Sequence, residues 1–280
     1  MAVKIEPHRK KVRRRVNKKR ARIVFDKYDF YRRAVQSAEN DVVFIRDTYK
    51  ELKKRNARTF REDFCGTFAL STEWIKLNPR HEAIGIDLDP EPMAYGKTHY
   101  LSKLKPEQQK RMTLHERNVL QPNLPKADIV AAMNFSYFCF KSREVMKLYF
   151  ANVYKTLGKE GIFLVDCFGG SQCQGPIEDT IKLDGFTYYW DQSNYDPVSG
   201  EALFYIHFRV GGQKIEKVFT YDWRLWSIPE LREIMSEVGF KKTHVYWEGT
   251  AKDGSGDGVF TRTEKGESCD SWIAYIVAEK

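Results

Sequence analysis

The chain has 280 residues, of which 42% are hydrophobic, 14% aromatic and 30% charged. This composition predicts a globular protein with a sizeable core and argues against a disordered polymer. No window approaches the ~18 continuous apolar residues of a membrane helix, and the N-terminus lacks the apolar stretch of a signal peptide. We therefore expect neither a membrane-spanning nor a secreted protein.

The cysteines argue against a disulfide framework and against a cysteine-ligated zinc site. There are five, they are widely spaced, and no two form a CxxC pair. An odd number without close pairs fits a reducing compartment, so we expect the protein to be cytoplasmic. The positions are Cys65, Cys139, Cys167, Cys173 and Cys269.

The positive charge is concentrated at the N-terminus. Residues 1–22 carry eleven Lys and Arg residues against a single acid, Glu6, whereas the whole chain has a net charge of +9. The remaining residues are therefore nearly neutral, and we predict that 1–22 form a basic, disordered tail. Such a tail either binds phosphate groups with little sequence preference or is a solvated extension without a specific partner. No aromatic residue lies in the run to stack on bases, which leaves both interpretations open.

The chain after the tail begins with a helical segment, residues 23–57. Apolar residues at helical spacing predict a helix over 41–54, with Asn40 or Asp41 as its N-cap. Strands and helices then alternate, which predicts a parallel, doubly wound sheet. The predicted strands are 59–64, 83–86, 111–117, 129–133 and 162–165, and the predicted helices are 70–77, 90–104 and 141–157.

The pattern changes after the fifth predicted strand. Strand-like segments at 186–195, 202–210 and 214–221 are separated by turn residues, which predicts an antiparallel insertion near 180–221 that acts as a lid or small extra layer. A capping box at Ser227 opens another helix that ends at Gly239. Strands at 243–247 and 272–277 close the main domain, residues 58–280, with a polar loop between them at 249–270.

Two acidic positions point to a ligand at the carboxyl ends of the strands. The first strand ends in three charged residues, Arg61, Glu62 and Asp63, and leads into Gly66. Charge there is costly unless it meets a ligand or a partner, such as a carboxylate paired with Arg61. Asp87 ends the next strand about 20 residues after Gly66, which is the spacing used to bind ribose hydroxyls. We therefore favour a nucleoside-bearing ligand.

These residues resemble a family. Glu62-Asp63-Phe64-Cys65-Gly66-Thr67 resembles the D-x-x-C-G-T-G opening of class I S-adenosylmethionine-dependent methyltransferases. The segments 85–88, 117–120 and 127–130 are similar to the ribose-binding segment, the adenine-contacting segment and the fourth strand of that family. The resemblance covers about 41–166 and resumes at 227. It implies a Rossmann-like, doubly wound, mostly parallel seven-stranded sheet and S-adenosylmethionine as cofactor.

The resemblance also implies a set of cofactor-binding residues. Phe64 and Phe68 stand where the family has glycines, which would let the backbone approach the cofactor less freely. The same bulk makes a dinucleotide dehydrogenase less favoured, because pyrophosphate needs that room. The implied residues are Glu62, Phe64, Cys65, Gly66, Thr67, Asp87, Leu88, Asn118, Val119, Asn134, Phe135 and Tyr28.

Candidates for the acceptor site follow the fourth predicted strand. Asn134 and Tyr137 end a tetrad that resembles the [DNS]-P-P-[YF] motif of amino-methylating enzymes, although both prolines are absent. The alternative is that the aromatic residues here pack in the core. Tyr28 and Tyr31 precede the first predicted helix, and they either cover the cofactor and sulfonium or anchor the segment. The six histidines form no close ligand set, so we expect no metal.

Three functions remain open from the sequence. The first is a methyltransferase for a nitrogen or oxygen nucleophile of a small molecule, which the aromatic insertion would enclose. The second is an RNA or ribonucleoprotein methyltransferase that uses the basic tail. The third is a non-catalytic protein that binds the cofactor.

Overall fold

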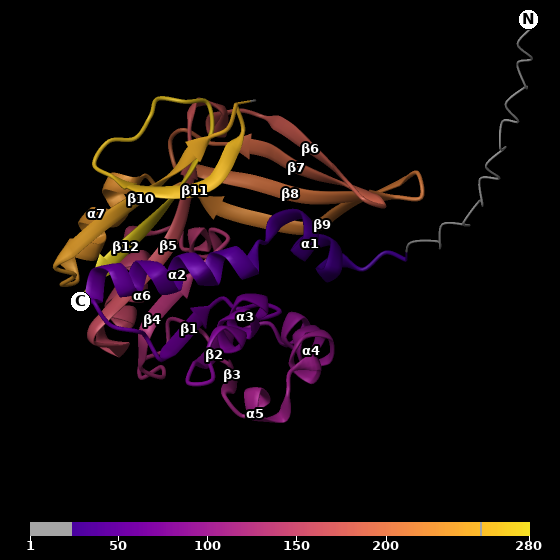
Figure 1. Cartoon of the computed structure of the whole chain (residues 1–280). Coiled ribbons are helices and arrows are strands. Elements are labelled where there is room, and N and C mark those ends of the chain that lie inside the picture. Colours follow the sequence, from indigo (N-terminus) through magenta and orange to yellow (C-terminus); the bar gives the residue numbers. More distant parts are fainter. Residues whose placement is uncertain (1–23, 253) are drawn as a thin grey trace, which may run out of the picture.

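A computed structural model describes residues 24–252 and 254–280, and the predicted basic tail lies outside them. The chain order of the elements is shown in Figure 1. Within the described residues the α-helices are α1 (Lys27–Val35), α2 (Ala38–Lys53), α3 (Ala69–Leu77), α4 (Pro90–His99), α5 (Pro106–Gln109), α6 (Arg143–Thr156) and α7 (Ile228–Glu237). The 3-10 helices are η1 (Leu101–Lys103), η2 (Ser136–Cys139) and η3 (Ser171–Gln174).

Two sheets form the body of the protein. The larger sheet has eight strands in the order β11-β10-β12-β5-β4-β1-β2-β3, and the smaller has four in the order β6-β7-β8-β9. The strands are β1 (Thr59–Asp63), β2 (Glu82–Asp87), β3 (Met112–Glu116), β4 (Ala127–Ala132), β5 (Leu157–Gly169), β6 (Ile177–Leu183), β7 (Phe186–Tyr195), β8 (Glu201–Val210), β9 (Gln213–Arg224), β10 (Lys242–Thr250), β11 (Gly256–Thr263) and β12 (Trp272–Glu279).

The larger sheet is parallel from β3 to β5 and antiparallel from β12 to β11. The strand order reverses between β1 and β4, which are hydrogen-bonded neighbours. In sheets of this kind, ligands bind outside the carboxyl ends of the strands at such a reversal. The topology therefore directs attention to the segments that follow β1 and β4.

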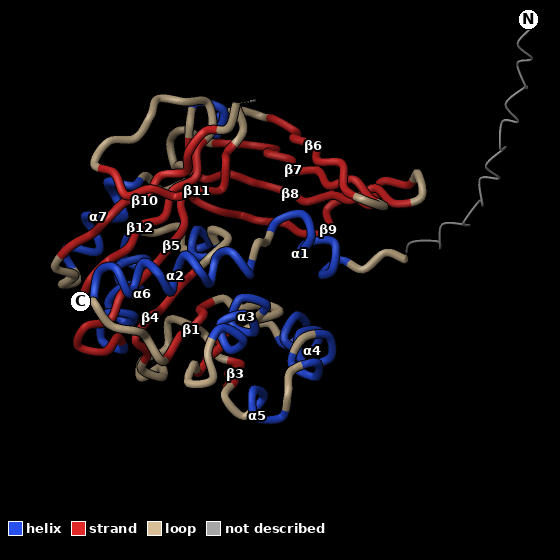
Figure 2. The backbone as a smooth tube through the Cα atoms, viewed as in Figure 1, coloured by secondary structure: helices blue, strands red, loops and turns tan. Residues whose placement is uncertain are grey.

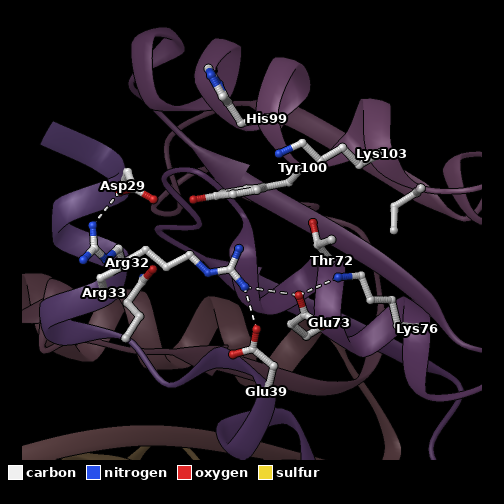
Figure 3. Close-up of a pocket in the computed structure, with 12 residues that line it drawn as sticks. Asp29, Arg32, Arg33, Glu39, Thr72, Glu73, Lys76, His99, Tyr100 and Lys103 are labelled. Carbon is white, nitrogen blue, oxygen red and sulfur yellow. Dashed lines mark hydrogen bonds and ion pairs between the residues drawn. The ribbon is translucent and has the colours of Figure 1, made fainter. Parts of the chain in front are cut away.

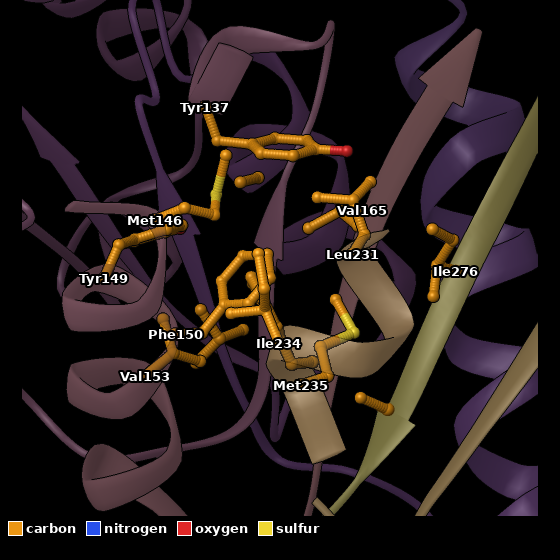
Figure 4. Close-up of a cluster of buried hydrophobic side chains, with 14 of the residues drawn as sticks. Tyr137, Met146, Tyr149, Phe150, Val153, Val165, Leu231, Ile234, Met235 and Ile276 are labelled. Atoms are coloured by element: carbon orange, nitrogen blue, oxygen red, sulfur yellow. The ribbon is translucent and has the colours of Figure 1, made fainter. Parts of the chain in front are cut away.

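Helices cover both faces of the larger sheet because its central strands are apolar on both sides. Ile129 and Ala131 of β4 face a cluster that includes α2 and α3, whereas Val130 and Ala132 face a cluster that includes α6 and α7. Figure 4 shows the second cluster, where side chains of α6 and α7 meet β5 and β12. Three layers thus hold the carboxyl edge of the sheet rigidly.

The smaller sheet is inserted between β5 and α7 and packs against α1 (Figure 2). Its inner face is aromatic, and Phe30 of α1 stacks on Phe186 of β7 with ring centroids 4.1 Å apart. Phe208 of β8 packs on the same pair. Helix α1 therefore joins the insertion to the main body.

The fold class predicted from the sequence is confirmed, with local corrections. The larger sheet has eight strands instead of seven, because β11 forms within the segment 249–270 that we predicted as a loop. Helix α2 begins after Ser37 instead of Asn40 or Asp41. Asp41 lies in the first turn of α2 and accepts a hydrogen bond from the Tyr275 hydroxyl, at 3.2 Å. Among the described residues, no helix is both long enough and apolar enough to cross a membrane.

Candidate functional site

The three charged residues at the end of β1 have two different roles. Arg61 and Asp63 form a buried pair, and Glu62 lies at the edge of the candidate site. Arg61 and Asp63 are fully buried and form an ion pair, with Nε 2.9 Å from Oδ1. The Tyr149 hydroxyl donates to the same carboxylate, at 3.0 Å. Pairing with a neighbouring carboxylate, the structural alternative considered for Arg61, is therefore what the structure shows.

Glu62 lies between the pair and binds the start of α3. Its Oε2 accepts hydrogen bonds from the backbone N–H of Ser71, at 2.9 Å, and from the Ser71 hydroxyl, at 2.5 Å. Burial raises the pKa of Glu62 to about 8, with smaller contributions from the nearby carboxylates Asp87 and Asp41. The structure thus gathers acidic groups from β1, β2 and α2 at one edge of the sheet.

The turn after β1 presents a bare backbone to open space. Gly66 has a φ of +49°, and a Cβ placed there would meet no atom within 4 Å. Its backbone N–H donates to Oδ2 of Asp87, at 2.6 Å. Asp87 Oδ1 accepts from the backbone N–H of Asp89, at 2.9 Å, so this carboxylate orders both the turn and the start of α4.

The two phenylalanines that replace glycines of the family motif do not fill this space. Phe64 packs against Phe140 and Tyr149, and Phe68 is fully buried against Gly96 of α4. Both residues have a positive φ, 58° and 49°. The strained backbone turns their rings into the core, away from the open side of Gly66.

The loop after β4 is held by a buried carboxylate. Asn134 and Phe135 both have a positive φ, 58° and 55°, which is unfavourable for residues other than glycine. Their backbone N–H groups donate to Oδ2 and Oδ1 of Asp166, at 2.6 and 2.9 Å. Burial raises the pKa of Asp166 to about 7, although these hydrogen bonds oppose the rise. Asp166 thereby fixes the geometry of the loop.

Tyr137, predicted as a candidate for the acceptor site, lies in the core of this structure. Its side chain is fully buried, and its hydroxyl donates to the backbone oxygen of Asp166, at 2.6 Å. The ring lies in the core cluster of Figure 4, beside Phe150. The alternative of core packing holds here, because η2 turns this ring inward whereas Asn134 and Phe135 stay half-buried.

Tyr28 and Tyr31 lie within α1 and not before the first helix, and they face different neighbours. Tyr28 packs on Tyr95 of α4, with ring centroids 4.8 Å apart. Tyr31 packs on Phe219 of β9, at 5.1 Å. Burial raises the pKa of Tyr31 to about 12. Helix α1 therefore bridges α4 and the insertion, and both tyrosines contribute to that anchoring.

A cavity of about 490 Å³ opens beside the loop after β4. Its lining comes from α1, α2, both sheets and the ends of β4 and β5, and includes the predicted residues Tyr31, Asn134 and Phe135. Asp41 and Asp166 also line it. Of the residues implied for the cofactor, Asn134 and Phe135 line the cavity, whereas none of the residues 62–67, 87–88 or 118–119 does, so the cavity overlaps the predicted cofactor site only at the loop after β4.

Comparisons with known proteins agree with this architecture. The sequence matches no protein-family model and no curated protein. A methyltransferase from Clostridium acetobutylicum that depends on S-adenosylmethionine matches the structure with a TM-score of 0.63 at 17% identity, over 89% of this chain and 96% of that one. An amino pentose methyltransferase of calicheamicin biosynthesis from Micromonospora echinaspora matches with a TM-score of 0.65 at 13% identity, over 92% and 98%. The chain has the class I methyltransferase fold.

Another protein of similar structure is described as an N-methyltransferase. A sugar N-methyltransferase from a Streptoalloteichus species has a TM-score of 0.60 at 14% identity, covering 100% of this chain and 98% of that one. The matches span nearly the whole length of both chains, so the fold assignment includes the insertion and the closing strands. At these identities the likeness concerns the fold.

The remaining residues implied by the methyltransferase resemblance lie at the same edge of the sheet. Leu88 is 65% exposed directly after β2. Asn118 follows β3, and its side-chain oxygen accepts from the backbone N–H of Leu120, at 2.8 Å. Val119 is buried in the core cluster with Ile86. Cys65 is also buried, and a Cβ at Gly85 would press on its sulfur, so Gly85 lets β2 approach the turn closely.

A second cavity, of about 510 Å³, lies between α1, α3 and α4 (Figure 3). Arg32 crosses it and pairs with Glu39 and Glu73, at 2.7 and 3.3 Å, and Lys76 pairs with the same Glu73. The Arg32 guanidinium also lies 4.9 Å from the Tyr100 ring centroid. These charges neutralise one another, and we interpret this cavity as part of the attachment of α1 to the body.

One set of side chains has the spacing of a metal site. Glu178, Asp191 and His207 of the insertion bring ligand atoms within 4.8 Å of one another. However, the backbone N–H of Lys217 donates to Nδ1 of His207, at 2.7 Å, so the neutral ring carries its proton on Nε2, facing Asp191. Lys214 pairs with Glu178, at 2.7 Å. A protonated Nε2 cannot ligate a metal, and we interpret the set as a hydrogen-bonded sheet surface.

Sequence reasoning missed two carboxylates, Asp41 and Asp166, that line the cavity beside the loop after β4. Asp166 follows the apolar run 162–165 as Asp87 follows 83–86, and that signal was available in the sequence, although β5 continues to Gly169. Asp41 was interpreted as a helix cap, because helical spacing alone does not show that Tyr275 reaches it from a strand more than 200 residues away. The aromatic rings of β9 and β12 in the cavity likewise come from sequence too distant to align by pattern.

Proposed function

We propose that the protein is an S-adenosylmethionine-dependent methyltransferase that acts on a small molecule. The observation that carries this proposal is the turn at Gly66, which presents open backbone at the reversal of strand order in a sheet with the methyltransferase fold. A nucleoside needs such an approach, because a side chain there would occupy its place. The neighbouring carboxylate of Asp87 can accept hydrogen bonds from ribose hydroxyls.

The residues present fit the cofactor. Gly66 leaves room, Phe64 and Phe68 point into the core, and Glu62 and Asp87 supply acceptors at the carboxyl edge. When bound, S-adenosylmethionine supplies a methyl group that is already activated by its sulfonium charge. The chain has to hold the cofactor, orient an acceptor next to Asn134 and exclude water. Helix α1 and the insertion enclose the cavity in which that orientation would take place.

A small molecule is favoured over RNA by the charge of the cavity. The side chains that line it include Asp41, Asp166, Asp179 and Glu248, and no Lys, Arg or His is among the described lining residues. A phosphate backbone would be repelled by these groups. The N-methyltransferases of similar fold act, by their names, on sugars and glycopeptides. RNA methylation would have to depend on the tail 1–22, outside the described residues.

Calorimetric titration with S-adenosylmethionine and S-adenosylhomocysteine tests the proposal. We expect both to bind. We expect Asp87→Asn to weaken binding about tenfold or more, because an amide has only one acceptor oxygen for the Gly66 N–H and the ribose hydroxyls, where the carboxylate has two. Glu82→Gln is the matched control, since Glu82 is at the opposite end of the same strand and pairs only with the exposed Arg58. Failure of both ligands to bind the wild-type protein would exclude the proposed function.

A labelling experiment separates an enzyme from a non-catalytic binding protein. We expect incubation with methyl-labelled cofactor and a fractionated cell extract to transfer label to a low-molecular-weight fraction. Transfer to RNA would favour the alternative acceptor. Binding without any transfer would leave the non-catalytic role.

A further inference from the structure

The cavity beside Asn134 combines aromatic walls with acidic groups. Trp223 and Tyr188 are almost fully buried yet line it, and Phe168, Trp190 and Tyr221 add partly exposed rings. The rings hold one another in place: Tyr221 stacks on Trp223 with centroids 4.5 Å apart, and Phe135 lies 4.6 Å from Phe168. Their positions are therefore fixed before any ligand enters.

The acidic groups of the cavity have no basic partners in its lining. Both oxygens of Asp166 accept backbone N–H groups, and Asp41 accepts the Tyr275 hydroxyl, at 3.2 Å, and interacts with the backbone N–H of Ser37. Tyr275 is paired with Asp166 in the register of β12 and β5, so the two carboxylates lie on either side of one tyrosine. Burial raises the pKa of Asp41 to about 6, with a smaller contribution from Glu39. A carboxylate in that situation is stabilised by an incoming positive charge.

Aromatic faces and uncompensated carboxylates together select one ligand chemistry. Ring faces carry negative electrostatic potential and attract ammonium groups, most strongly where water is excluded. A neutral alcohol gains from the aromatic walls and can donate a hydrogen bond to a carboxylate, but it brings no positive charge, and an anion is opposed by both. A cationic amine with an apolar flank gains from each.

We infer that the acceptor is a small molecule that bears a protonated amine, bound with its ammonium group directed toward Asp41 and Asp166 and its apolar part against the rings of β7 and β9. This inference rests on the proposed function for its chemistry, because the cavity borders the loop at Asn134 where an acceptor would meet the methyl donor. Binding of a cation by these side chains does not depend on the proposed function.

Tryptophan fluorescence provides a direct test, because Trp190 and Trp223 line the cavity. The probes are phenethylamine, which is protonated at neutral pH, and 2-phenylethanol, its neutral isostere. We expect the wild-type protein to bind the amine about tenfold or more tightly than the alcohol. We also expect added salt to weaken amine binding and to leave alcohol binding unchanged. Equal affinity for the two probes, or no binding of the amine, would overturn the inference.

A pair of variants assigns the preference to the cavity. Asp41→Asn should reduce amine affinity about tenfold and leave alcohol affinity as it was. Asp47→Asn is the control, because Asp47 lies on the same helix but is exposed and paired with Arg46, at 2.7 Å. Loss of affinity for both probes in Asp41→Asn would contradict a charge-specific role. The comparison of the two probes in the wild-type protein is decisive even if that variant does not fold.

Saturating S-adenosylhomocysteine distinguishes this inference from the proposed function. If the cavity belongs to the acceptor, the amine preference persists with the cofactor product bound. Displacement of phenethylamine would assign the carboxylates to the cofactor and overturn the inference. If S-adenosylhomocysteine binds but amine and alcohol remain equal, the inference fails and the proposed function stands. If the protein prefers the amine but does not bind S-adenosylhomocysteine, the cation site stands and the proposed function fails.

Discussion

Three carboxyl groups with raised pKa values lie close to the candidate site. Glu62, Asp166 and Asp41 each lie at the carboxyl edge of the larger sheet or against it, and burial raises the pKa of each. Each has a hydrogen-bond donor but no basic side chain as its partner in the described structure. Such groups destabilise the folded state when they are ionised, and they lie where we expect a ligand to bind.

Glu62 makes the stability depend on pH. Because its folded pKa of about 8 is above its ordinary value of 4.5, the folded state binds this proton more tightly than the unfolded state. The stabilisation is complete below pH ~4.5 and is lost as the pH rises toward 8. We expect Glu62→Gln, which stays neutral, to become more stable relative to the wild type by on the order of 3 kcal/mol across this range.

Urea unfolding of both proteins between pH 4.5 and 8.5 measures the difference. The groups that face Glu62 are the Ser71 hydroxyl and amide and the carboxylates of Asp87 and Asp41, and all are retained in the variant. Glu116→Gln, which removes an exposed carboxylate at the end of β3, should follow the wild-type profile. A constant difference between Glu62→Gln and the wild type would show that this carboxyl does not titrate in the range.

Asp166 supports the loop after β4, which lines the cavity. We expect Asp166→Ala to lower the free energy of unfolding by about 3 kcal/mol, because two backbone N–H groups lose their acceptor and two residues with positive φ lose their support. Asp191→Ala, which removes a carboxylate of the insertion surface, should cost less than about 1 kcal/mol. Urea denaturation checks both. An equal effect of the two substitutions would contradict the role of Asp166.

At the scale of elements, the contact between α4 and the turn after β1 depends on one missing side chain. Helix α4 approaches the turn so closely that a Cβ at Gly96 would collide with the backbone oxygen of Thr67 and the ring of Phe68. Replacing glycine by alanine inside a helix normally stabilises it by about 1 kcal/mol. Here the collision is with backbone, which cannot move away cheaply, so overpacking should outweigh that gain.

We expect Gly96→Ala to destabilise the protein by about 2 kcal/mol and to weaken binding of S-adenosylhomocysteine, because it displaces the turn that we propose binds the cofactor. Gly158→Ala adds the same methyl group where the nearest contact would be the backbone oxygen of Ala127, at 3.6 Å, and should change neither property. Thermal unfolding and calorimetry measure the two effects. Stabilisation by Gly96→Ala would show that α4 is free to shift.

Helix α1 is held between two layers by aromatic contacts. Phe30 is 1% exposed and stacks on Phe186. We expect Phe30→Ala to cost about 3 kcal/mol and to raise hydrogen exchange throughout α1, because the helix loses its main contact with the insertion. Leu148→Ala, at a position 49% exposed on α6, is the control. Unchanged exchange in α1 would mean that other contacts hold it.

The sequence predicted the repeating parts of the fold better than the contacts between remote segments. The alternation of apolar strands and capped helices located the parallel half of the sheet, and the Asp89 and Ser227 caps are present as hydrogen bonds. β11 was missed because Gly256 and Gly258 resemble a loop, and its pairing with β10 is a tertiary property. Tyr137 was chosen from a resemblance to a four-residue motif, which cannot show the inward turn made by η2.

For the molecule as a whole, charge is divided between regions. The basic residues of 1–22 exceed the net charge of the chain, whereas the cavity is lined by acids only among its charged groups. Any affinity of this protein for nucleic acid should therefore depend on those first residues. The enzyme site and a polyanion would be kept apart by the sign of their charges.

Removal of residues 1–22 tests this division. We expect the full chain to bind single-stranded RNA weakly, with an affinity that falls steeply between about 50 and 200 mM salt, and the shortened chain to show no such binding. Binding of phenethylamine and S-adenosylhomocysteine should be the same in both. RNA binding that survives the deletion would place a second basic surface on the body, and loss of small-ligand binding would give the first residues a role in the site.

The way in which the cavity is enclosed has a consequence for how specificity can change. The turn at Gly66 follows β1 and its partner Asp87 ends β2, whereas four of the aromatic residues that line the cavity, Tyr188, Trp190, Tyr221 and Trp223, come from the inserted sheet. Exchanging residues on the inner face of that sheet would change the shape of the cavity without altering the turn at Gly66 or Asp87. Related chains could therefore diversify in what they modify while keeping one donor, and libraries confined to β7, β8 and β9 would be the economical place to look for new selectivity.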